Sequence, residues 1–332
     1  MSQHRVLVIG VGSIGERHAR CFQQTGRADV SVCDIDPALR SDVAARYGGL
    51  PAHADIESAI AALPHAAVVC TPAHLHVEMA TRLAERGVHL LVEKPLSVDE
   101  RGIEQLKQAV KENNLTAAVA YVNRAHPVLQ HMHEGLSGGR FGKPLQVVAV
   151  SGQNFPFYRP AYREIYYKDR ATGGGAIQDA LTHLVNAVEW LVGPMTEVAA
   201  DAAHLALPGV EVEDTVNVIA RHGAIPASYS LNQHQPPNES TLTVICEAGV
   251  VRFEPHAQRW RWTTKTDEPW HDEIHEPIER DTPFVRQADA FLDALEGTAT
   301  PLCSLAEGEQ TLRCNLAILK SADTHTWQTV GG

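Results

Sequence analysis

Apolar positions in the first 122 residues form short continuous runs, separated by segments in which apolar residues recur at helical spacing. A continuous apolar run is typical of a strand buried on both faces of a parallel sheet. Alternation of such strands with amphipathic helices favours a doubly wound α/β domain. The predicted strands are Arg5–Gly10, Val30–Asp34, Ala67–Cys70, Val88–Val92 and Leu115–Tyr121, and the predicted helices are Ile14–Gln24, Leu75–Arg86 and a segment from a capping box at Ser97–Glu100 to about Asn113.

The pattern changes after Asn123. The apolar segments become longer, and apolar positions alternate with polar ones, which predicts an antiparallel sheet in an α+β domain. The clearest such segments are Gln146–Val150, Val216–Arg221 and Thr241–Cys246.

Length agrees with two domains, because the chain has 332 residues and a typical domain has about 100–200. We place the first domain at residues 1–122 and the second at 123–332. Two amphipathic helices at about 284–322 close the chain, and they are candidates to pack back on the first domain.

Charge and cysteine content narrow the class of protein. The formal net charge is -12 and the sequence has no run of Lys or Arg. It therefore lacks the excess of positive charge that is typical of nucleic-acid-binding proteins. None of the six cysteines has C-x-x-C spacing, which predicts buried thiols rather than disulfides or a zinc site. We see neither a signal peptide nor an apolar run of about 18 residues, and expect a cytoplasmic protein that does not span a membrane.

Eighteen histidines raise the question of a metal site. His271 and His275 are four positions apart, but the acidic stretch around them has the character of exposed strand or loop. His131 and His133 are two positions apart in a predicted helix and therefore face apart. We expect no metal.

A glycine-rich motif, Gly10-Val-Gly12-Ser13-Ile14-Gly15, stands between the first predicted strand and the first predicted helix. In that setting Gly10 allows a tight turn, Gly12 lets the backbone approach a pyrophosphate, and Gly15 lets the helix pack closely. The N–H groups of the first helical turn, including those of Ser13 and Ile14, are available to the phosphates. The motif predicts a Rossmann dinucleotide-binding domain.

Asp34 ends the second predicted strand, nineteen positions beyond Gly15. A carboxylate there accepts hydrogen bonds from the ribose hydroxyls and repels a 2′-phosphate, so we expect NAD as the cofactor. Asp36 is a competing ribose contact, although the Pro37 that follows favours a helix cap.

Candidate catalytic residues lie in both domains. Lys94 directly follows the strand Val88–Val92, and ligands of open α/β sheets bind beyond the carboxyl ends of strands. In the second domain, an amphipathic helix follows three glycines at Gly173 and carries Asp179 and His183 four positions apart, on one face. The alternatives are a surface lysine and an aspartate that only caps the helix or pairs with His183.

These residue types suit the oxidation of a secondary alcohol. The reaction removes a hydride from carbon and a proton from oxygen, so it requires a base near the hydroxyl. His183 is the best candidate base, because imidazole titrates near neutrality. Lys94 can stabilise the developing alkoxide, and Asp179 can orient His183 or bind a neighbouring hydroxyl. A tyrosine of the segment before the helix, or Lys94 itself, is the alternative base.

Aromatic residues concentrate just before this helix, where residues 155–167 hold six of them in a chain that is 6% aromatic. Aromatic rings suit a sugar ring, and arginines suit a carboxylate or phosphate, so a sugar acid, a phosphorylated sugar and a nucleotide sugar all stay open. Packing between the domains is the competing interpretation. The candidate substrate contacts here are Tyr158, Arg159, Tyr162 and Arg163.

Taken together, these motifs resemble the glucose–fructose oxidoreductase/inositol dehydrogenase (Gfo/Idh/MocA) family. The matching pieces occur in the family's order over most of residues 5–190. They are Gly10–Gly15, Thr71-Pro-Ala-His-Leu-His76, Glu93-Lys94-Pro95, Tyr121-Val-Asn-Arg124 with Pro127, and Gly173–His183.

The resemblance implies catalytic roles for Lys94, Asp179 and His183. It also implies a cis Lys94–Pro95 bond, and a second domain with a large, mainly antiparallel open-faced sheet that makes a homo-oligomer, a dimer or tetramer. By the same resemblance, Arg124 is a substrate contact, and the cofactor contacts include Thr71, Pro72, His76, Glu93, Lys94 and Asn123. One departure is Asn186, where many members carry Asp.

The favoured function is an NAD-dependent dehydrogenase acting on a sugar, polyol or sugar derivative. Two alternatives remain. One is a glycoside-cleaving enzyme that uses bound NAD for transient oxidation, as some members of the family do. The other is a non-catalytic sugar or NAD sensor, against which the joint presence of Lys94, Asp179 and His183 argues.

Overall fold

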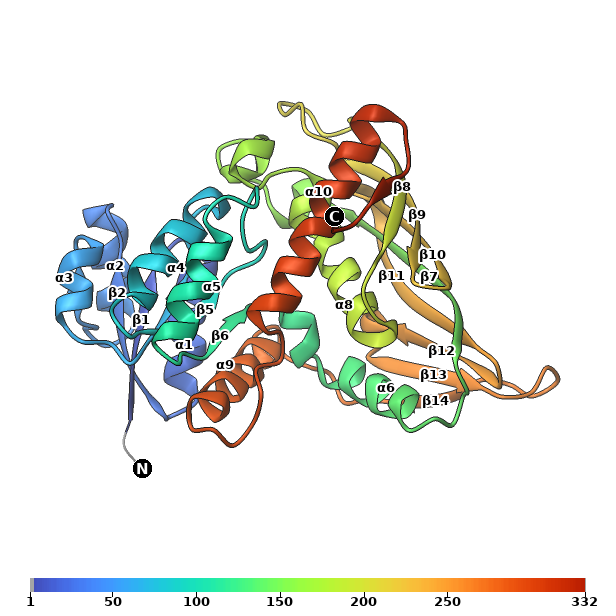
Figure 1. Cartoon of the computed structure of the whole chain (residues 1–332), viewed down its shortest axis with the longest axis horizontal. Coiled ribbons are helices and arrows are strands. Elements are labelled where there is room, and N and C mark those ends of the chain that lie inside the picture. The colour runs from blue at the N-terminus through green and yellow to red at the C-terminus, as the bar shows by residue number, and fades with distance from the viewer. Residues whose placement is uncertain (1–2, 332) are drawn as a thin grey trace. The chain divides into compact units, whose positions relative to one another are not determined.

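The computed structural model describes residues 3–331, and their contacts divide the chain into two compact units (Figure 1). The first unit comprises residues 1–125 together with 280–309, and the second comprises residues 126–279 together with 310–332. The first unit therefore includes a segment from near the C-terminus.

Six parallel strands form the sheet of the first unit, in the order β3-β2-β1-β4-β5-β6. The order reverses between β1 and β4, which is the doubly wound arrangement predicted from the sequence. The strands are β1 (His4–Ile9), β2 (Ala28–Cys33), β3 (Ala52–His53), β4 (Ala66–Val69), β5 (His89–Val92) and β6 (Ala117–Val119). The helices are α1 (Ser13–Gln24), α2 (Pro37–Arg46), α3 (Ile56–Ala61), α4 (His76–Ala84), α5 (Ile103–Glu112) and α9 (Thr282–Leu295), with short 3₁₀ turns η1 (Ala73–Leu75) and η2 (Val122–Ala125).

The core of this unit explains why its central strands β1 and β4 are apolar on both faces over most of their length. Val8 of β1 and Val68 of β4 are fully buried in one cluster with Phe22 of α1. Phe291 of α9 meets Phe22 edge-on, with ring centroids 6.3 Å apart. Helix α9 therefore completes the core of the N-terminal sheet, although it is close to the other end of the chain.

The helix predicted to open at Ser97 begins instead at Ile103, so that prediction was wrong. Ser97 Oγ accepts a 3.4 Å hydrogen bond from the backbone N–H of Asp99, which closes a turn. Gly102 then precedes the helix with φ of 79°. A serine caps a helix only from the position directly before the first helical turn. The turns between Ser97 and Ile103 place this serine too far from the start of α5.

Helix α3 had no sequence prediction, and for α2 only the cap at Asp36 was expected. Each begins at an aspartate cap: Asp36 Oδ1 accepts a 2.9 Å hydrogen bond from Ala38 N, and Asp55 Oδ1 accepts one of 2.9 Å from Ser58 N. The capping role expected of Asp36 is therefore confirmed.

Nine strands form the sheet of the second unit, in the order β14-β13-β12-β11-β7-β10-β9-β8-β15. Among the described strands of this sheet, only the β7–β10 pair is parallel. The strands are β7 (Pro144–Asn154), β8 (Glu197–Ala203), β9 (Thr215–His222), β10 (Ile225–Asn232), β11 (His234–Cys246), β12 (Gly249–Glu254), β13 (Arg259–Thr263), β14 (His271–Ile274) and β15 (Gln328–Thr329). The helices are α6 (Pro127–Ser137), α7 (Phe155–Tyr158), α8 (Thr182–Val192) and α10 (Leu305–Thr324), with a π turn η5 (Ile177–Leu181) and 3₁₀ turns η3 (Tyr166–Lys168), η4 (Arg170–Thr172) and η6 (Pro255–Ala257).

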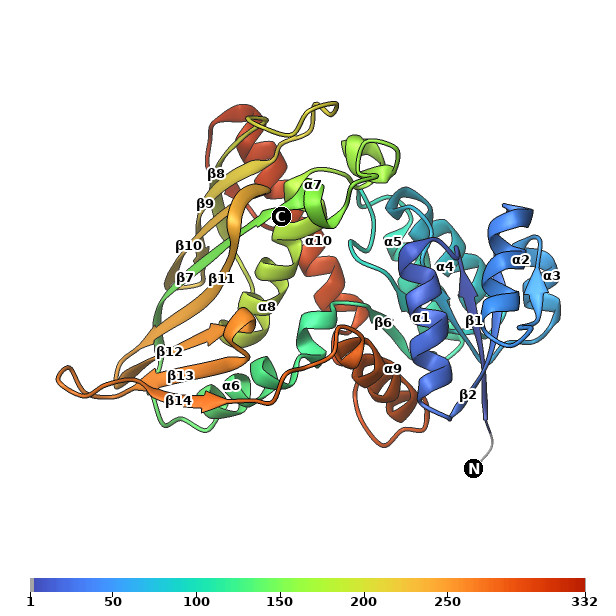
Figure 2. The same cartoon turned by 180° about the vertical axis from the view of Figure 1, so that it is seen from behind.

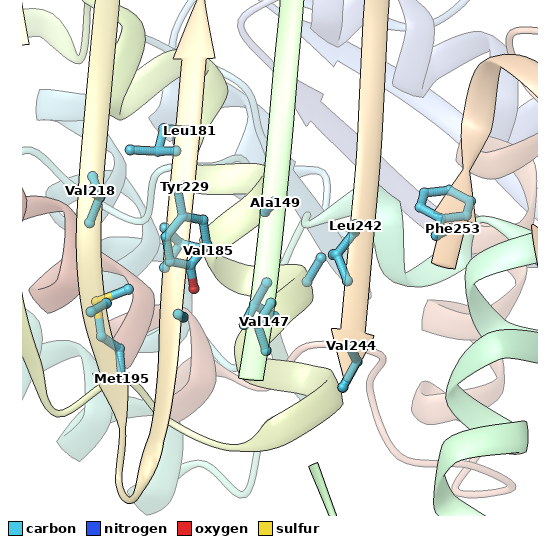
Figure 3. Packing of buried hydrophobic residues seen from close by; sticks show 14 of the residues in the cluster. Val147, Ala149, Leu181, Val185, Met195, Val218, Tyr229, Leu242, Val244 and Phe253 are labelled. Atoms are coloured by element: carbon cyan, nitrogen blue, oxygen red, sulfur yellow. The ribbon is translucent and has the colours of Figure 1, made fainter. Parts of the chain in front are cut away.

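One face of this sheet is buried by helices. Val218 of β9 and Tyr229 of β10 point to that face, together with Leu181 and Val185 from the start of the helical segment (Figure 3). Helices α6, α8 and the part of α10 that belongs to this unit all lie on that side (Figures 1 and 2). The alternation of apolar and polar positions in these strands thus reflects one covered face, as predicted.

The other face of the nine-stranded sheet carries small and β-branched side chains. Ile219 of β9 is 60% exposed, and Val148, Val150 and Ile245 are partly exposed. The open face suggested by the family resemblance is therefore present.

Among the described residues, no helix is both long and apolar enough to cross a membrane. All six cysteines are buried, as their spacing predicted.

Candidate active site

The glycine-rich turn after β1 depends on two close backbone approaches. Gly10 has φ of +80°, and a Cβ there would lie 2.9 Å from the carbonyl carbon and oxygen of Cys70. A Cβ at Gly15 would lie 1.8 Å from the oxygen of Gly10. Glycine at these two positions lets α1 begin directly against the turn.

The space above the turn fits a dinucleotide pyrophosphate. Gly12 precedes α1 without any side-chain cap, so the first N–H groups of the helix are available to an anion. A Cβ at Gly12 would find no atom within 4 Å. Beside the turn, Thr71 Oγ1 is buried without a hydrogen-bond partner in residues 3–331. An orphan hydroxyl and a bare helix start are what a bound phosphate would satisfy.

Asp34 lies at the carboxyl end of β2, against the glycine turn. Its Oδ2 accepts a 2.8 Å hydrogen bond from Val11 N, and its Oδ1 accepts one of 2.9 Å from Asp36 N. Arg40 donates to the backbone oxygen of Asp34 at 2.5 Å. The carboxylate is thus fixed beside the glycine turn, where it can act as a hydrogen-bond acceptor.

Glu93 forms a buried pair with a residue that the sequence analysis missed. Its Oε1 lies 2.7 Å from His18 Nε2 on α1, and the two side chains are 7% and 1% exposed. Burial tends to raise the pKa of Glu93, but the hydrogen bond and charge of His18, with the charge of Lys94, bring the pKa below its ordinary value. The only sequence signal for this pair was a histidine on the apolar face of α1.

The same glutamate holds the backbone that presents Lys94. Glu93 Oε2 accepts a 3.0 Å hydrogen bond from Lys94 N. The Lys94–Pro95 bond is cis, as the resemblance predicted.

His76 joins the loops that follow β4 and β5. Its Nδ1 lies 3.0 Å from the oxygen of Pro95, and its Nε2 lies 2.6 Å from the oxygen of Thr71. The ring is 1% exposed, and burial lowers its pKa despite these carbonyls. Both ring nitrogens contact backbone oxygens, so the geometry supports a role in holding Thr71 rather than a direct contact with a cofactor.

Asn123 and Arg124 lie in the 3₁₀ turn that follows β6. Asn123 is partly exposed, whereas Arg124 is only 2% exposed. Arg124 donates to the oxygen of Leu302 at 2.9 Å and pairs with Glu307. This engagement inside the first unit argues against the substrate contact expected of Arg124.

In the second unit, Asp179 and His183 open the helical segment that the sequence predicted. Asp179 lies in the π turn, His183 lies in the first turn of α8, and both are partly exposed. The expectation of a regular helix was wrong at its start, because a π turn winds more widely than an α turn. Spacing by four residues therefore does not align the two side chains as it does in an α-helix.

A buried glutamate, also missed from the sequence, fixes the start of this helical segment. Glu213 is 2% exposed, and its Oε1 accepts a 3.1 Å hydrogen bond from Ile177 N. Its Oε2 accepts one of 2.7 Å from Arg170 Nε. Arg170, one of the cations near the aromatic segment, therefore holds the glutamate that caps this segment.

In the aromatic segment before the helix, some side chains are buried and others are exposed to solvent. Tyr162 is 1% exposed and its hydroxyl donates to the oxygen of Pro208 at 2.7 Å, the same atom that receives Arg163 Nε at 2.7 Å. Tyr162 thus has a packing role that argues against substrate contact. Tyr158 is 50% exposed, and Arg159 is also exposed.

Tyr166 reaches the candidate catalytic helix. Its hydroxyl donates to Asp179 Oδ1 at 2.7 Å. Asn186, the departure from the family pattern, is 1% exposed and donates to Thr311 Oγ1 at 3.0 Å, so it packs α8 against α10.

Two family models match this chain. One, the oxidoreductase family with an NAD-binding Rossmann fold, matches residues 4–121, and the Gfo/Idh/MocA C-terminal domain matches residues 129–252. The chain belongs to the Gfo/Idh/MocA family. The protein is therefore an NAD-dependent oxidoreductase, and the resemblance drawn from its motifs is confirmed.

Curated relatives and solved structures agree with this assignment. The chain is 25% identical over 347 residues to levoglucosan dehydrogenase of Pseudarthrobacter phenanthrenivorans, covering 90% of this chain and 88% of that protein. It is 26% identical over 226 residues to inositol 2-dehydrogenase of Rhizobium meliloti, covering 64% and 63%. The fold matches a solved levoglucosan dehydrogenase in complex with NADH and levoglucosan with a TM-score of 0.90, 21% identity and full coverage of both chains.

Proposed function

We propose that this protein is a dehydrogenase that transfers a hydride from a secondary hydroxyl of a sugar, polyol or sugar derivative to NAD. The observation that carries the proposal is the pair Asp179 and His183, partly exposed at the start of a helical segment that the buried Glu213 fixes. An imidazole and a carboxylate on one rigid segment supply a general base for alcohol oxidation and a group that can orient the base or the substrate.

All the cofactor residues proposed from the sequence belong to the first unit. His76 contacts the backbone oxygens of Thr71 and Pro95, and Glu93 accepts from the backbone N–H of Lys94, so both are proposed to hold the loops around the cofactor. Bound NAD supplies the hydride acceptor. The residues proposed to hold it are Gly10, Gly12, Ser13, Ile14, Gly15, Asp34, Thr71, Pro72, Asn123 and the backbone of Lys94.

Each catalytic side chain has a distinct proposed task. His183 accepts the hydroxyl proton, and Asp179 orients His183 or binds a neighbouring hydroxyl. Lys94 as an ammonium stabilises the alkoxide that develops on oxygen. Lys94 belongs to the first unit and the other two belong to the second, so their meeting at the substrate is part of the proposal.

The remaining candidate substrate contacts are Tyr158, Arg159 and Arg163. The exposed ring of Tyr158 suits an apolar sugar face, and Arg159 offers a guanidinium to an acidic substituent. Neutral and acidic sugars are therefore both part of the test.

The function is tested by incubating the protein with NAD⁺ and a panel of polyols, anhydrosugars, sugar acids, phosphorylated sugars, nucleotide sugars and glycosides. NADH absorbance and released sugar are measured together. We expect NADH in stoichiometric yield with at least one alcohol. Sugar release without accumulation of NADH would show glycoside cleavage instead, and binding without either product would show a sensor.

We also propose that the open face of the nine-stranded sheet makes a homo-oligomer, a dimer or tetramer. The partly exposed apolar residues on that face support this, since such surfaces usually bind a partner.

A further inference from the structure

Tyr166 contacts a side chain that the proposed chemistry uses. Its hydroxyl donates to Asp179 Oδ1 at 2.7 Å, while 41% of the residue stays exposed. A hydrogen bond from a neutral O–H to a carboxylate is charge-assisted and stronger than a bond between neutral groups. Thirteen positions separate the two residues, so the contact depends on how the chain folds back between them.

The backbone around Tyr166 is fixed by the turn that opens the helical segment. Thr172 Oγ1 donates to the oxygen of Tyr166 at 2.8 Å, and Gly175 N donates to the oxygen of Tyr167 at 3.1 Å. A Cβ at Gly174 would lie 2.7 Å and 2.2 Å from these same two oxygens. The run of glycines therefore lets the tyrosine backbone approach the turn, and the hydroxyl is aimed before any substrate binds.

We propose that Tyr166 is a positioning residue, which holds the Asp179 carboxylate in one orientation during the reaction. This inference rests on the proposed function. Tyr166 keeps its proton throughout, and it acts by fixing Oδ1 so that Asp179 meets the substrate or His183 in a defined geometry. Preorganisation of this kind contributes through the residue that is held.

A Tyr166→Phe variant removes the hydroxyl and keeps the ring. Loss of a hydrogen bond to a charged group predicts a decrease in kcat/KM of about 10–100-fold. In an Asp179→Ala background, the same substitution should change kcat/KM by less than about twofold, because the acceptor of the Tyr166 hydroxyl is already gone. Independent, multiplicative effects of the two substitutions would overturn the inference.

Tyr167→Phe is the matched control, since it also removes a tyrosine hydroxyl from this segment. The hydroxyl of Tyr167 donates to Gln233, and its ring packs beside Phe155 in a small separate core. We expect a lower melting temperature with kcat/KM within about twofold of wild type. A loss equal to that of Tyr166→Phe would attribute both effects to packing and overturn the inference.

A second measurement separates this inference from the proposed function. If the wild-type protein oxidises no alcohol in the panel, the proposed function fails, and ¹³C NMR of the Asp179 carboxyl group then decides the inference alone. Removing a hydrogen bond to the charged form should raise the pKa of Asp179 in Tyr166→Phe. The neighbouring His183, Tyr167 and Glu213 are the same in both proteins. An unchanged Asp179 pKa would overturn the inference.

Discussion

At the scale of single residues, both units fix a carboxylate with a partner that the sequence does not reveal. Glu93 is held by His18 across 75 positions, and Asp179 is held by Tyr166 across 13. The sequence predicted three of these four residues as chemically important or as part of the substrate segment, but not the pairing. The first pairing depends on which helix face meets the end of β5, and the second depends on how the chain folds back between residues 166 and 179. Periodicity specifies neither.

The Glu93–His18 pair predicts acid-sensitive stability of the first unit. The pKa of Glu93 in the folded state is below its ordinary value of 4.5, so ionised Glu93 stabilises the fold. This contribution is complete above pH 4.5 and is lost as the pH falls through the folded-state pKa. Chemical denaturation at decreasing pH should show a decrease in the free energy of unfolding that is smaller in Glu93→Gln.

Replacing only one member of this pair is expected to be costly. His18→Leu leaves the buried Glu93 charge without its partner, which predicts a loss of about 3–5 kcal/mol in the free energy of unfolding at neutral pH. The double variant His18→Leu/Glu93→Leu, which removes both polar groups, should recover most of that loss. No recovery would show that His18 acts through its shape rather than through Glu93.

The base assignment predicts a selective loss in His183→Ala. Turnover should fall by about 10²–10⁴-fold, the usual contribution of a positioned proton acceptor. NAD affinity, measured by calorimetry, should stay within about twofold, because Gly10–Gly15 and Asp34 are proposed to hold the cofactor. Near-native turnover would move the base role to Lys94 or to the exposed Tyr158.

Cofactor preference is predicted to depend on Asp34. Its carboxylate is fixed by Val11 N and Asp36 N beside the glycine turn. Asp34→Ala removes the ribose acceptor and the charge that repels a 2′-phosphate, so the ratio of NAD to NADP affinity should fall. Tighter binding of NADP than NAD by the wild-type protein would contradict this.

At the scale of elements, the glycine turn gives a matched pair of substitutions. Gly12→Ala places a methyl group where no atom lies within 4 Å, at a φ of -61° that alanine adopts, so the apo protein should melt at the wild-type temperature. NAD affinity should nevertheless fall at least tenfold, because the methyl group occupies the space proposed for the pyrophosphate.

Gly15→Ala should lower the melting temperature of the apo protein, which Gly12→Ala leaves unchanged. Its Cβ would lie 1.8 Å from the oxygen of Gly10, so α1 must move away from the turn, and the melting temperature should fall by several degrees. Thermal melts and NAD titrations of both variants check this. Equal destabilisation by the two substitutions would contradict the assigned geometry.

Elements with a continuous apolar run or with helical spacing could be predicted, and elements without either pattern, such as α3 and β3, could not. Continuous apolar runs located β1 and β4, and helical spacing located α1 and α9. The helix does not begin near Ser97 as predicted, because a hydrogen-bonded turn forms there instead. The π turn at Ile177–Leu181 was not predicted, because the spacing of apolar residues does not distinguish it from an α-helix. Local hydrogen bonds at element ends compete with the pattern that the sequence displays.

At the scale of the whole molecule, the change of pattern near Asn123 predicted the two-part organisation, but the return of residues 280–309 to the first unit depends on tertiary packing. Helix α9 is amphipathic, and either unit offers an apolar surface to such a helix. Its contacts with the first unit, such as Phe291 against Phe22 and the ion pair between Asp293 and Arg27, identify which unit receives it. The amphipathic pattern made this helix a candidate to pack on the first domain, but it did not predict which residues make contact.

The open face of the nine-stranded sheet predicts self-association. Ile219, at 60% exposure, lies on this face of β9, and Val148, Val150 and Ile245 lie on the same face. Burying such a surface against a second copy is favourable, and a charge at its centre should oppose it. Sedimentation velocity at micromolar concentration should show a dimer or tetramer for wild type and a shift toward monomer for Ile219→Lys. Leu205→Lys, at a loop residue that is 67% exposed, is the matched control and should retain the oligomer. A monomeric wild-type protein, or equal effects of the two lysines, would contradict an interface on this face.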